Sequence, residues 1–248
     1  MEQQDILSMT LPELQAAVQE LGEPKFRAKQ IFNWLHQKRV TDFSEMTTLS
    51  LPFRERLASD FCINRLKIAK RLASSVDDTV KYLYELPDGN YVETVCMQYH
   101  HGTSLCISTQ VGCRMGCRFC ASAIAGFVRN LTPAEMLLQI YETERAQNCK
   151  ISSLVLMGIG EPLDNFDNVL RFLQLLSDPN GYGMSLRHVT VSTCGVVPKI
   201  LELAEQRLGL TLSVSLHCPN DAGRSAIMPI NRSYPIDVLL DACQTYFE

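Results

Sequence analysis

Residues 112–120 read Gly-Cys-Arg-Met-Gly-Cys-Arg-Phe-Cys, and this stretch decides how the 248-residue chain is interpreted. Its cysteines are spaced C-x3-C-x2-C, with an aromatic residue before the last, so one loop can aim three thiolates at one place. Three cysteine ligands suit a 4Fe-4S cluster in which one iron stays open to another ligand. The sequence therefore predicts that Cys113, Cys117 and Cys120 hold such a cluster.

A zinc site is the alternative for the same three cysteines. Structural zinc takes four ligands, often from paired C-x2-C hooks, and the chain has one triple without a second hook. His217 or Cys218 can complete a set of four. The N-terminal residues 1–5 contain no basic or apolar leader, and no stretch approaches the ~20 apolar residues of a membrane span. We therefore expect a cytoplasmic protein without membrane contact, whose ten cysteines stay reduced.

The net charge of −4 is unevenly distributed along the chain. Between residues 24 and 71 there are eleven Lys and Arg against four Asp and Glu. A basic segment on an acidic protein favours a local contact with nucleic acid, and a solvated helical face is the other interpretation. The basic residues around the second predicted helix are Lys25, Arg27, Lys29, Lys38 and Arg39.

The hydrophobic pattern divides the chain into three regions. Residues 1–63 have helical spacing and predict a small helical domain. Residues 64–101 alternate and predict a β-hairpin or meander with a turn at residues 87–90. In residues 102–248 strands alternate with helices, which predicts a parallel sheet. The last helix reaches Glu248 without a C-cap, so we expect further sequence after it.

The four parallel strands predict an incomplete (β/α) barrel, which gives an α/β fold with a bare edge at the last strand. They are expected at residues 105–108, 153–157, 188–192 and 210–216. Polar residues and glycines follow each strand, at the end where α/β barrels place their sites. The cysteine loop follows the first strand.

A cysteine loop in this position resembles the signature of the radical S-adenosylmethionine (SAM) enzymes. In that superfamily the open iron binds the methionine end of SAM, and an electron from the cluster yields a 5′-deoxyadenosyl radical. The resemblance implies that a Gly-Glu-Pro motif binds the methionine ammonium, since a carboxylate accepts from it. It implies further contacts to the cofactor from the ends of the third and fourth strands. The implied cofactor-binding residues are Gly160, Glu161, Ser192, Ser215, Leu216 and His217.

Five segments in order resemble a narrower group, the RlmN/Cfr family of RNA methyltransferases. They are residues 106–113, 126–132, 157–162, 191–195 and 215–231. The adenine-C2-methylating branch is the closer match. The resemblance implies 23S rRNA and tRNA as substrates, the basic segment as an RNA-binding accessory domain, a flavodoxin-type electron donor and a monomer.

The same resemblance implies a mechanism that uses two molecules of SAM per turnover. One methylates a protein cysteine, and the radical from the other activates that methyl group for addition to C2 of adenine. Cys106 matches the cysteine that releases the product and leaves a disulfide, and Glu93 matches the proton acceptor. The family's methyl-carrying cysteine lies beyond Glu248, so we expect this chain alone to hold a cluster without methylating RNA.

Three other functions are compatible with the sequence. A Cfr-like enzyme methylates C8 of adenine in place of C2. A radical enzyme of another kind, such as an activase, needs no RNA and leaves the basic segment without a role. A zinc-stabilised RNA-binding module has no catalytic activity, and iron and sulfide analysis separates it from the radical enzymes.

Overall fold

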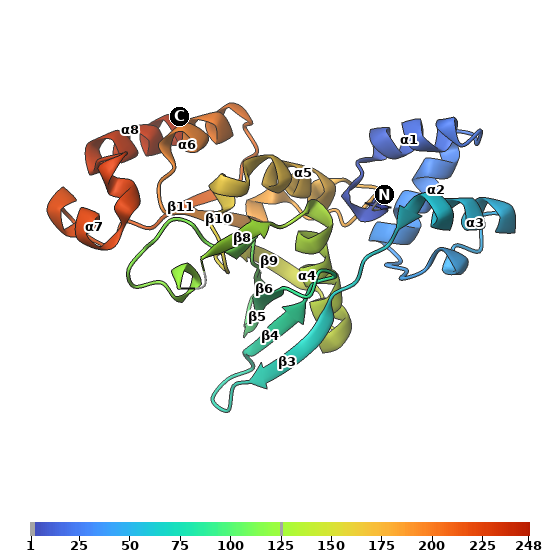
Figure 1. The fold of residues 1–248 in the computed structure, drawn as a ribbon, viewed down its shortest axis with the longest axis horizontal. Helices are drawn as coiled ribbons and strands as arrows, with labels where there is room; N and C mark the ends of the chain where they lie inside the picture. Colours follow the sequence, from blue (N-terminus) through green and yellow to red (C-terminus); the bar gives the residue numbers. More distant parts are fainter. Residues whose placement is uncertain (1–2, 125) are drawn as a thin grey trace.

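The computed structural model describes residues 3–124 and 126–248 (Figure 1). The α-helices are α1 (Leu11–Glu20), α2 (Phe26–His36), α3 (Leu51–Asp60), α4 (Pro133–Gln147), α5 (Phe166–Ser177), α6 (Val197–Glu205), α7 (Asp221–Ile227) and α8 (Ile236–Phe247). None of the helices in the described part of the chain combines the length and the apolar character that a bilayer crossing requires.

The strands of the described residues form one large sheet and two small ones. The strands are β1 (Gln4–Asp5), β2 (Phe61–Cys62), β3 (Lys67–Ala73), β4 (Val80–Glu85), β5 (Tyr91–Tyr99), β6 (Gly102–Cys106), β7 (Gln110–Gly112), β8 (Phe127–Asn130), β9 (Ile151–Leu156), β10 (Val189–Thr193) and β11 (Thr211–Val214). β1 pairs with β2, and β7 pairs with β8.

A seven-stranded mixed sheet runs through the molecule in the order β11-β10-β9-β6-β5-β4-β3 (Figure 1). The strands β6, β9, β10 and β11 are parallel, as the sequence predicts. The strands β3, β4 and β5 are antiparallel and continue the sheet beyond β6. The predicted incomplete barrel is therefore observed as the parallel half of a mixed sheet, with β11 at one edge and β3 at the other.

The join between the two halves is a hairpin that the sequence pattern did not indicate. β5 and β6 pair from Tyr99 and Gly102, with His100 and His101 in the turn between them. Gly102 has a φ of +130°, a conformation that other residues rarely adopt. Because the turn residues interrupt the alternation, the boundary predicted between residues 101 and 102 falls inside this hairpin.

The start of α4 follows the predicted capping pattern. The Thr132 hydroxyl accepts from the backbone N–H of Glu135, and the Glu135 carboxylate accepts from the backbone N–H of Thr132. Pro133 occupies the first helical position, where its missing N–H has no cost. This reciprocal capping fixes where the chain leaves the cysteine loop and enters the helix.

Helix α4 covers one face of the antiparallel strands. The Tyr84 hydroxyl lies 2.8 Å from the Thr143 hydroxyl, and Thr94 donates to Gln139 over 2.8 Å. These contacts come from alternate residues of β4 and β5, since successive side chains of a strand point to opposite faces. The other face of these strands therefore points away from α4.

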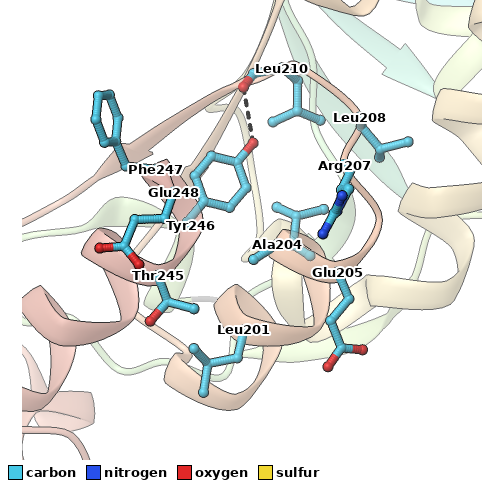
Figure 2. Close-up of a pocket in the computed structure, with 12 residues that line it drawn as sticks. Leu201, Ala204, Glu205, Arg207, Leu208, Leu210, Thr245, Tyr246, Phe247 and Glu248 are labelled. Carbon is cyan, nitrogen blue, oxygen red and sulfur yellow. Dashed lines mark hydrogen bonds between the residues drawn. The ribbon is translucent and has the colours of Figure 1, made fainter.

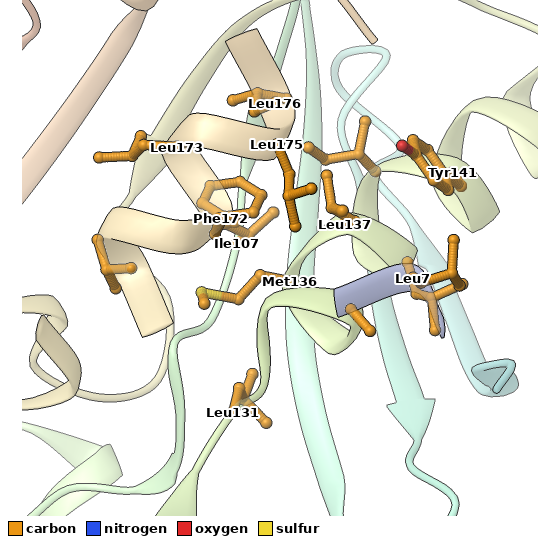
Figure 3. Close-up of a cluster of buried hydrophobic side chains, with 14 of the residues drawn as sticks. Leu7, Ile107, Leu131, Met136, Leu137, Tyr141, Phe172, Leu173, Leu175 and Leu176 are labelled. Atoms are coloured by element: carbon orange, nitrogen blue, oxygen red, sulfur yellow. The ribbon is translucent and has the colours of Figure 1, made fainter. Parts of the chain in front are cut away.

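The N-terminal helices pack against α4 and α5 and share one hydrophobic core with the sheet. Figure 3 shows Leu7, Met136 and Leu137 of α4 and Phe172 of α5 among the buried side chains of this core. Burial of each such side chain contributes about 1.5–3 kcal/mol. The helical part of the basic segment is therefore fixed relative to the sheet.

Candidate cluster and cofactor site

A cavity of about 270 Å³ lies at the carboxyl ends of β9, β10 and β11. All three cysteines of the loop line it. It also contains most of the residues that the sequence assigned to the cofactor. The predicted site residues in its lining are Cys113, Cys117, Cys120, Gly160, Glu161, Ser192, Ser215 and His217.

The cysteine loop is supported by the β7–β8 hairpin, which the sequence analysis did not predict. The backbone N–H of Cys113 donates to the Gly126 carbonyl over 3.0 Å. Gly112 has a φ of +73°, and a Cβ there would lie 1.7 Å from the same carbonyl oxygen. Arg114 forms an ion pair with Asp164 at 2.9 Å. The loop is thus fixed at its base and tied to the segment after β9.

The thiols of this loop are close enough to influence one another. Burial raises the pKa of Cys113 and of Cys117, and the neighbouring thiols Cys113 and Cys120 raise that of Cys117 further. Structural zinc takes four ligands that converge on one ion, whereas three cysteines can bind three irons of a four-iron cluster and leave the fourth open. The donor set of this loop therefore fits a cluster.

Glu161 is buried at the cavity wall with both oxygens hydrogen-bonded. One oxygen accepts from the Leu163 N–H at 3.0 Å and the other from the Cys194 N–H at 2.7 Å. Burial raises the pKa of this carboxyl, and the Cys194 and Leu163 N–H groups oppose that shift. A carboxylate accepts about four hydrogen bonds, so Glu161 retains capacity for an ammonium group in the cavity.

The Gly-Glu-Pro loop is packed against the strand that leads into the cysteines. Gly160 has a φ of +106°, and a Cβ there would lie 2.6 Å from the Cβ of Gln110. The Gln110 side chain accepts from the Glu161 N–H and donates to Asn130 and Asp164. Gln110 thus joins the two loops that face the cavity. The sequence offered no signal for this role, because it depends on contacts between distant segments.

Arg224 of α7 joins two strand ends and was missed by the sequence analysis. It is fully buried, and its guanidinium donates to Asn231 Oδ1 at 2.7 Å, the Cys194 carbonyl at 2.6 Å and the Ser215 carbonyl at 3.3 Å. The carbonyls follow β10 and β11, the strands that deliver Ser192 and Ser215 to the cavity. An arginine in a short polar helix gives no pattern that predicts this contact.

The segment after β11 places one predicted residue in the cavity and one outside its lining. The His217 ring lies against Phe119, with ring centroids 4.6 Å apart. His217 has a φ of +59°, which is uncommon for a residue other than glycine. Leu216 is not among the residues that line the cavity. The aromatic residue of the cysteine loop thus contacts the histidine of the fourth strand end.

Glu93 and Cys106 lie outside this cavity. Cys106 ends β6, where burial raises the pKa of its thiol. Glu93 lines a neighbouring cavity of about 350 Å³ with Tyr91 and Gly112, and its carboxylate forms an ion pair with Lys81 at 2.6 Å. No disulfide bond links cysteines of the described residues, so the structure does not support the disulfide that the resemblance implies.

The predicted basic segment contains residues of two kinds. Lys25, just before α2, and Lys29, on α2, are exposed. Arg39 forms an ion pair with Glu144 and lies over the ring of Tyr141, 5.1 Å from its centroid. Arg39 therefore joins the N-terminal helices to α4, and its charge is not free for a partner as the sequence interpretation assumed.

A larger cavity, of about 850 Å³, lies between α6, α8 and the start of β11 (Figure 2). Leu201, Leu208 and Tyr246 line it, and the Tyr246 hydroxyl donates to the Leu210 carbonyl. None of the predicted site residues belongs to its lining. The candidate site is therefore the smaller cavity beside the cysteines.

A three-cysteine loop that faces the carboxyl ends of parallel strands, with a buried glutamate opposite, defines a radical SAM enzyme. The family model of the radical SAM superfamily matches residues 107–248, and that of the ribosomal RNA large subunit methyltransferase N-terminal domain matches residues 4–63. A probable dual-specificity RNA methyltransferase RlmN from Lachnoclostridium phytofermentans is 51% identical over 98% of this chain and 68% of its own length. The chain belongs to the RlmN family of radical SAM RNA methyltransferases.

Two further relatives agree with this assignment. A probable dual-specificity RNA methyltransferase RlmN from Clostridium novyi is 48% identical over 98% of this chain and 71% of its own length. The crystal structure of a radical SAM methyltransferase from Sphaerobacter thermophilus superposes with a TM-score of 0.92 at 37% identity, covering 98% of this chain and 72% of that one. Membership in the superfamily implies a 4Fe-4S cluster and SAM as cofactors.

Proposed function

We propose that the chain serves the methylation of C2 of adenine in 23S rRNA and tRNA, with two molecules of SAM per turnover. The observation that carries the proposal is that Cys113, Cys117 and Cys120 line one cavity with Glu161. The dual specificity in the names of the relatives supports the two RNA substrates. The resemblance of the sequence motifs supports a flavodoxin-type electron donor and a monomer.

In this proposal the three cysteines hold the cluster, and Gly160 and Glu161 bind the methionine end of SAM. Glu161 accepts a hydrogen bond from the ammonium group, and the missing side chain of Gly160 lets the backbone approach. The remaining contacts, to the ribose and adenine, come from Ser192, Ser215, Leu216 and His217. When bound, the cluster and SAM supply a 5′-deoxyadenosyl radical.

Glu93 and Cys106 are assigned to the RNA side of the reaction. Glu93 takes the proton from C2 of the adenine, and Lys81, at 2.6 Å, orients its carboxylate. Cys106 is the thiol that releases the methylated base. Glu93 is half-exposed in a cavity beside the cysteine loop. This position supports the assignment, because the adenine of an RNA substrate can reach it from solvent.

The proposal is tested by anaerobic reconstitution with iron and sulfide, followed by reduction in the presence of SAM. We expect a brown protein that releases 5′-deoxyadenosine and methionine. Cys117→Ala abolishes both products, while Cys243→Ala, in α8 away from the cavity lining, retains them. Equal product from Cys117→Ala and the unchanged chain would refute the cluster assignment.

The position of methylation is tested separately with 23S rRNA fragments and tRNA. Reaction products are digested to nucleosides and compared with 2-methyladenosine and 8-methyladenosine standards by mass spectrometry. We expect 2-methyladenosine from preparations in which the methyl-carrying segment is also present. Formation of 8-methyladenosine would replace the C2 assignment with the Cfr-like one.

A further inference from the structure

Strand register places Lys81 and Cys106 on the same face of the sheet as Glu93. Leu83 of β4 lies opposite Glu93 of β5, and Lys81 lies opposite Val95, which in turn lies opposite Cys106 of β6. Residues directly opposite one another, or two apart on one strand, share a face. Lys81, Glu93 and Cys106 therefore lie on one face, the face that α4 does not cover.

A β-bulge brings two lysines of β3 onto that face. Lys67 lies opposite Glu85, and Lys70 lies opposite Leu83, because the register shifts between Ile68 and Lys70. Without the bulge, residues three apart would point to opposite faces. All seven residues of β3 are exposed, and neither lysine takes part in an ion pair within the described part of the chain.

An aromatic ring lies between these lysines and the cavity that contains Glu93. Tyr91 lies opposite Glu85, is 48% exposed, and lines the cavity together with Glu93 and Gly112 of the cysteine loop. Across the strands the face thus presents Lys67, then Glu85, and then Tyr91 at the edge of the cavity. Glu85 and Glu93 are its acidic groups, and Glu93 is already paired with Lys81.

We propose that this open face of β3, β4 and β5 is the track on which a single-stranded RNA segment lies beside the target adenine. Lys67 and Lys70 contact its phosphates, and a base stacks on Tyr91. Proteins that bind single strands combine such cations with exposed aromatic rings. The track rests on the proposed function, and its lysines are the part of the basic segment of residues 24–71 that lies on the sheet with Glu93.

The test measures the binding of a fluorescein-labelled RNA hairpin with an unpaired loop adenine, by anisotropy, at several salt concentrations. The double variant Lys67→Gln/Lys70→Gln removes two phosphate contacts. Each contact to a single strand contributes about 0.7 to the slope of log affinity against log salt, so the slope should fall by about 1.4. That corresponds to roughly 25-fold weaker binding at about 0.1 M salt.

Arg71→Gln is the matched control, because Arg71 is on the same strand but faces α4. It lies opposite Tyr82, whose hydroxyl accepts from Gln147 of α4. We expect this variant to keep the affinity and slope of the unchanged chain. Tyr91→Leu should weaken binding at least about fivefold, while Tyr91→Phe retains it, since stacking needs the ring and not the hydroxyl.

The outcomes separate the track from the function on which it rests. If the unchanged chain binds RNA and the double variant binds equally well, or Arg71→Gln is equally impaired, the track is wrong and the proposed function stands. If the unchanged chain binds no RNA, the proposed function itself is wrong. Release of 5′-deoxyadenosine without RNA should be the same for all variants, which shows that each is folded and loaded.

Discussion

Replacement of Arg224 by Met should destabilise the protein and loosen the cofactor site together. The change leaves the Asn231 side-chain oxygen and the Cys194 and Ser215 carbonyls without their buried donor. Each unsatisfied buried acceptor costs about 1–3 kcal/mol, and the 3.3 Å contact is the weakest. We therefore expect a loss of roughly 3–5 kcal/mol, which lowers the melting temperature by about 10 °C in a chain of this size.

The assay is urea unfolding followed by circular dichroism, with SAM binding to the cluster-loaded protein as a second measurement. Arg232→Met is the control, because Arg232 is exposed in the same segment. Arg224→Lys keeps the charge but has no planar fork to reach three acceptors, so it should recover only part of the stability. Stability of Arg224→Met within about 1 kcal/mol of the unchanged chain, with unchanged SAM affinity, would refute the reasoning.

Three further predictions concern a buried base, a glycine and the cavity carboxylate. Burial lowers the pKa of His36 to about 4, below its ordinary value of ~6.5, so the neutral ring is favoured in the folded state. About 3 kcal/mol of the free energy of unfolding is therefore fully present above pH ~6.5 and is lost as the pH falls to about 4. His36→Gln should remove this part of the pH dependence of the urea midpoint. Gly112→Ala should lower the iron content measured after reconstitution, because its Cβ would collide with the Gly126 carbonyl. Glu161→Gln should weaken SAM binding by roughly 10-fold or more in equilibrium dialysis, since a charge-assisted hydrogen bond is lost, and Glu205→Gln, outside the cavity, should not.

Local signals in the sequence predicted the parts of the fold that depend on neighbours along the chain. The capping pattern at Thr132 and Glu135 gave the start of α4, and alternation with turn residues gave the strands of the sheet. The cysteine spacing and the Gly-Glu-Pro motif identified residues that line one cavity. Each of these features is determined by residues close together in the chain, so it can be inferred from a single sequence.

The features that the sequence did not predict depend on contacts between distant segments. Arg224 donates to carbonyls nine and thirty residues away, and Gln110 reaches a loop fifty-one residues away. The continuity of the meander with the parallel strands depended on a turn at His100 and His101 that breaks the alternation. The face that Lys67 and Lys70 share depended on a bulge, which a strict two-residue period would place wrongly.

The strand β6 pairs antiparallel with β5 on one side and parallel with β9 on the other. If the proposed cofactor site and RNA track are correct, the radical chemistry lies on the parallel side of β6 and the RNA contact on its antiparallel side. In the proposed arrangement, substitutions on β3 or β4 can retarget the enzyme to another nucleic acid while the cluster loop keeps its scaffold. Redesign should therefore begin on the antiparallel strands β3 and β4. It should leave Cys106, the last residue of β6, unchanged.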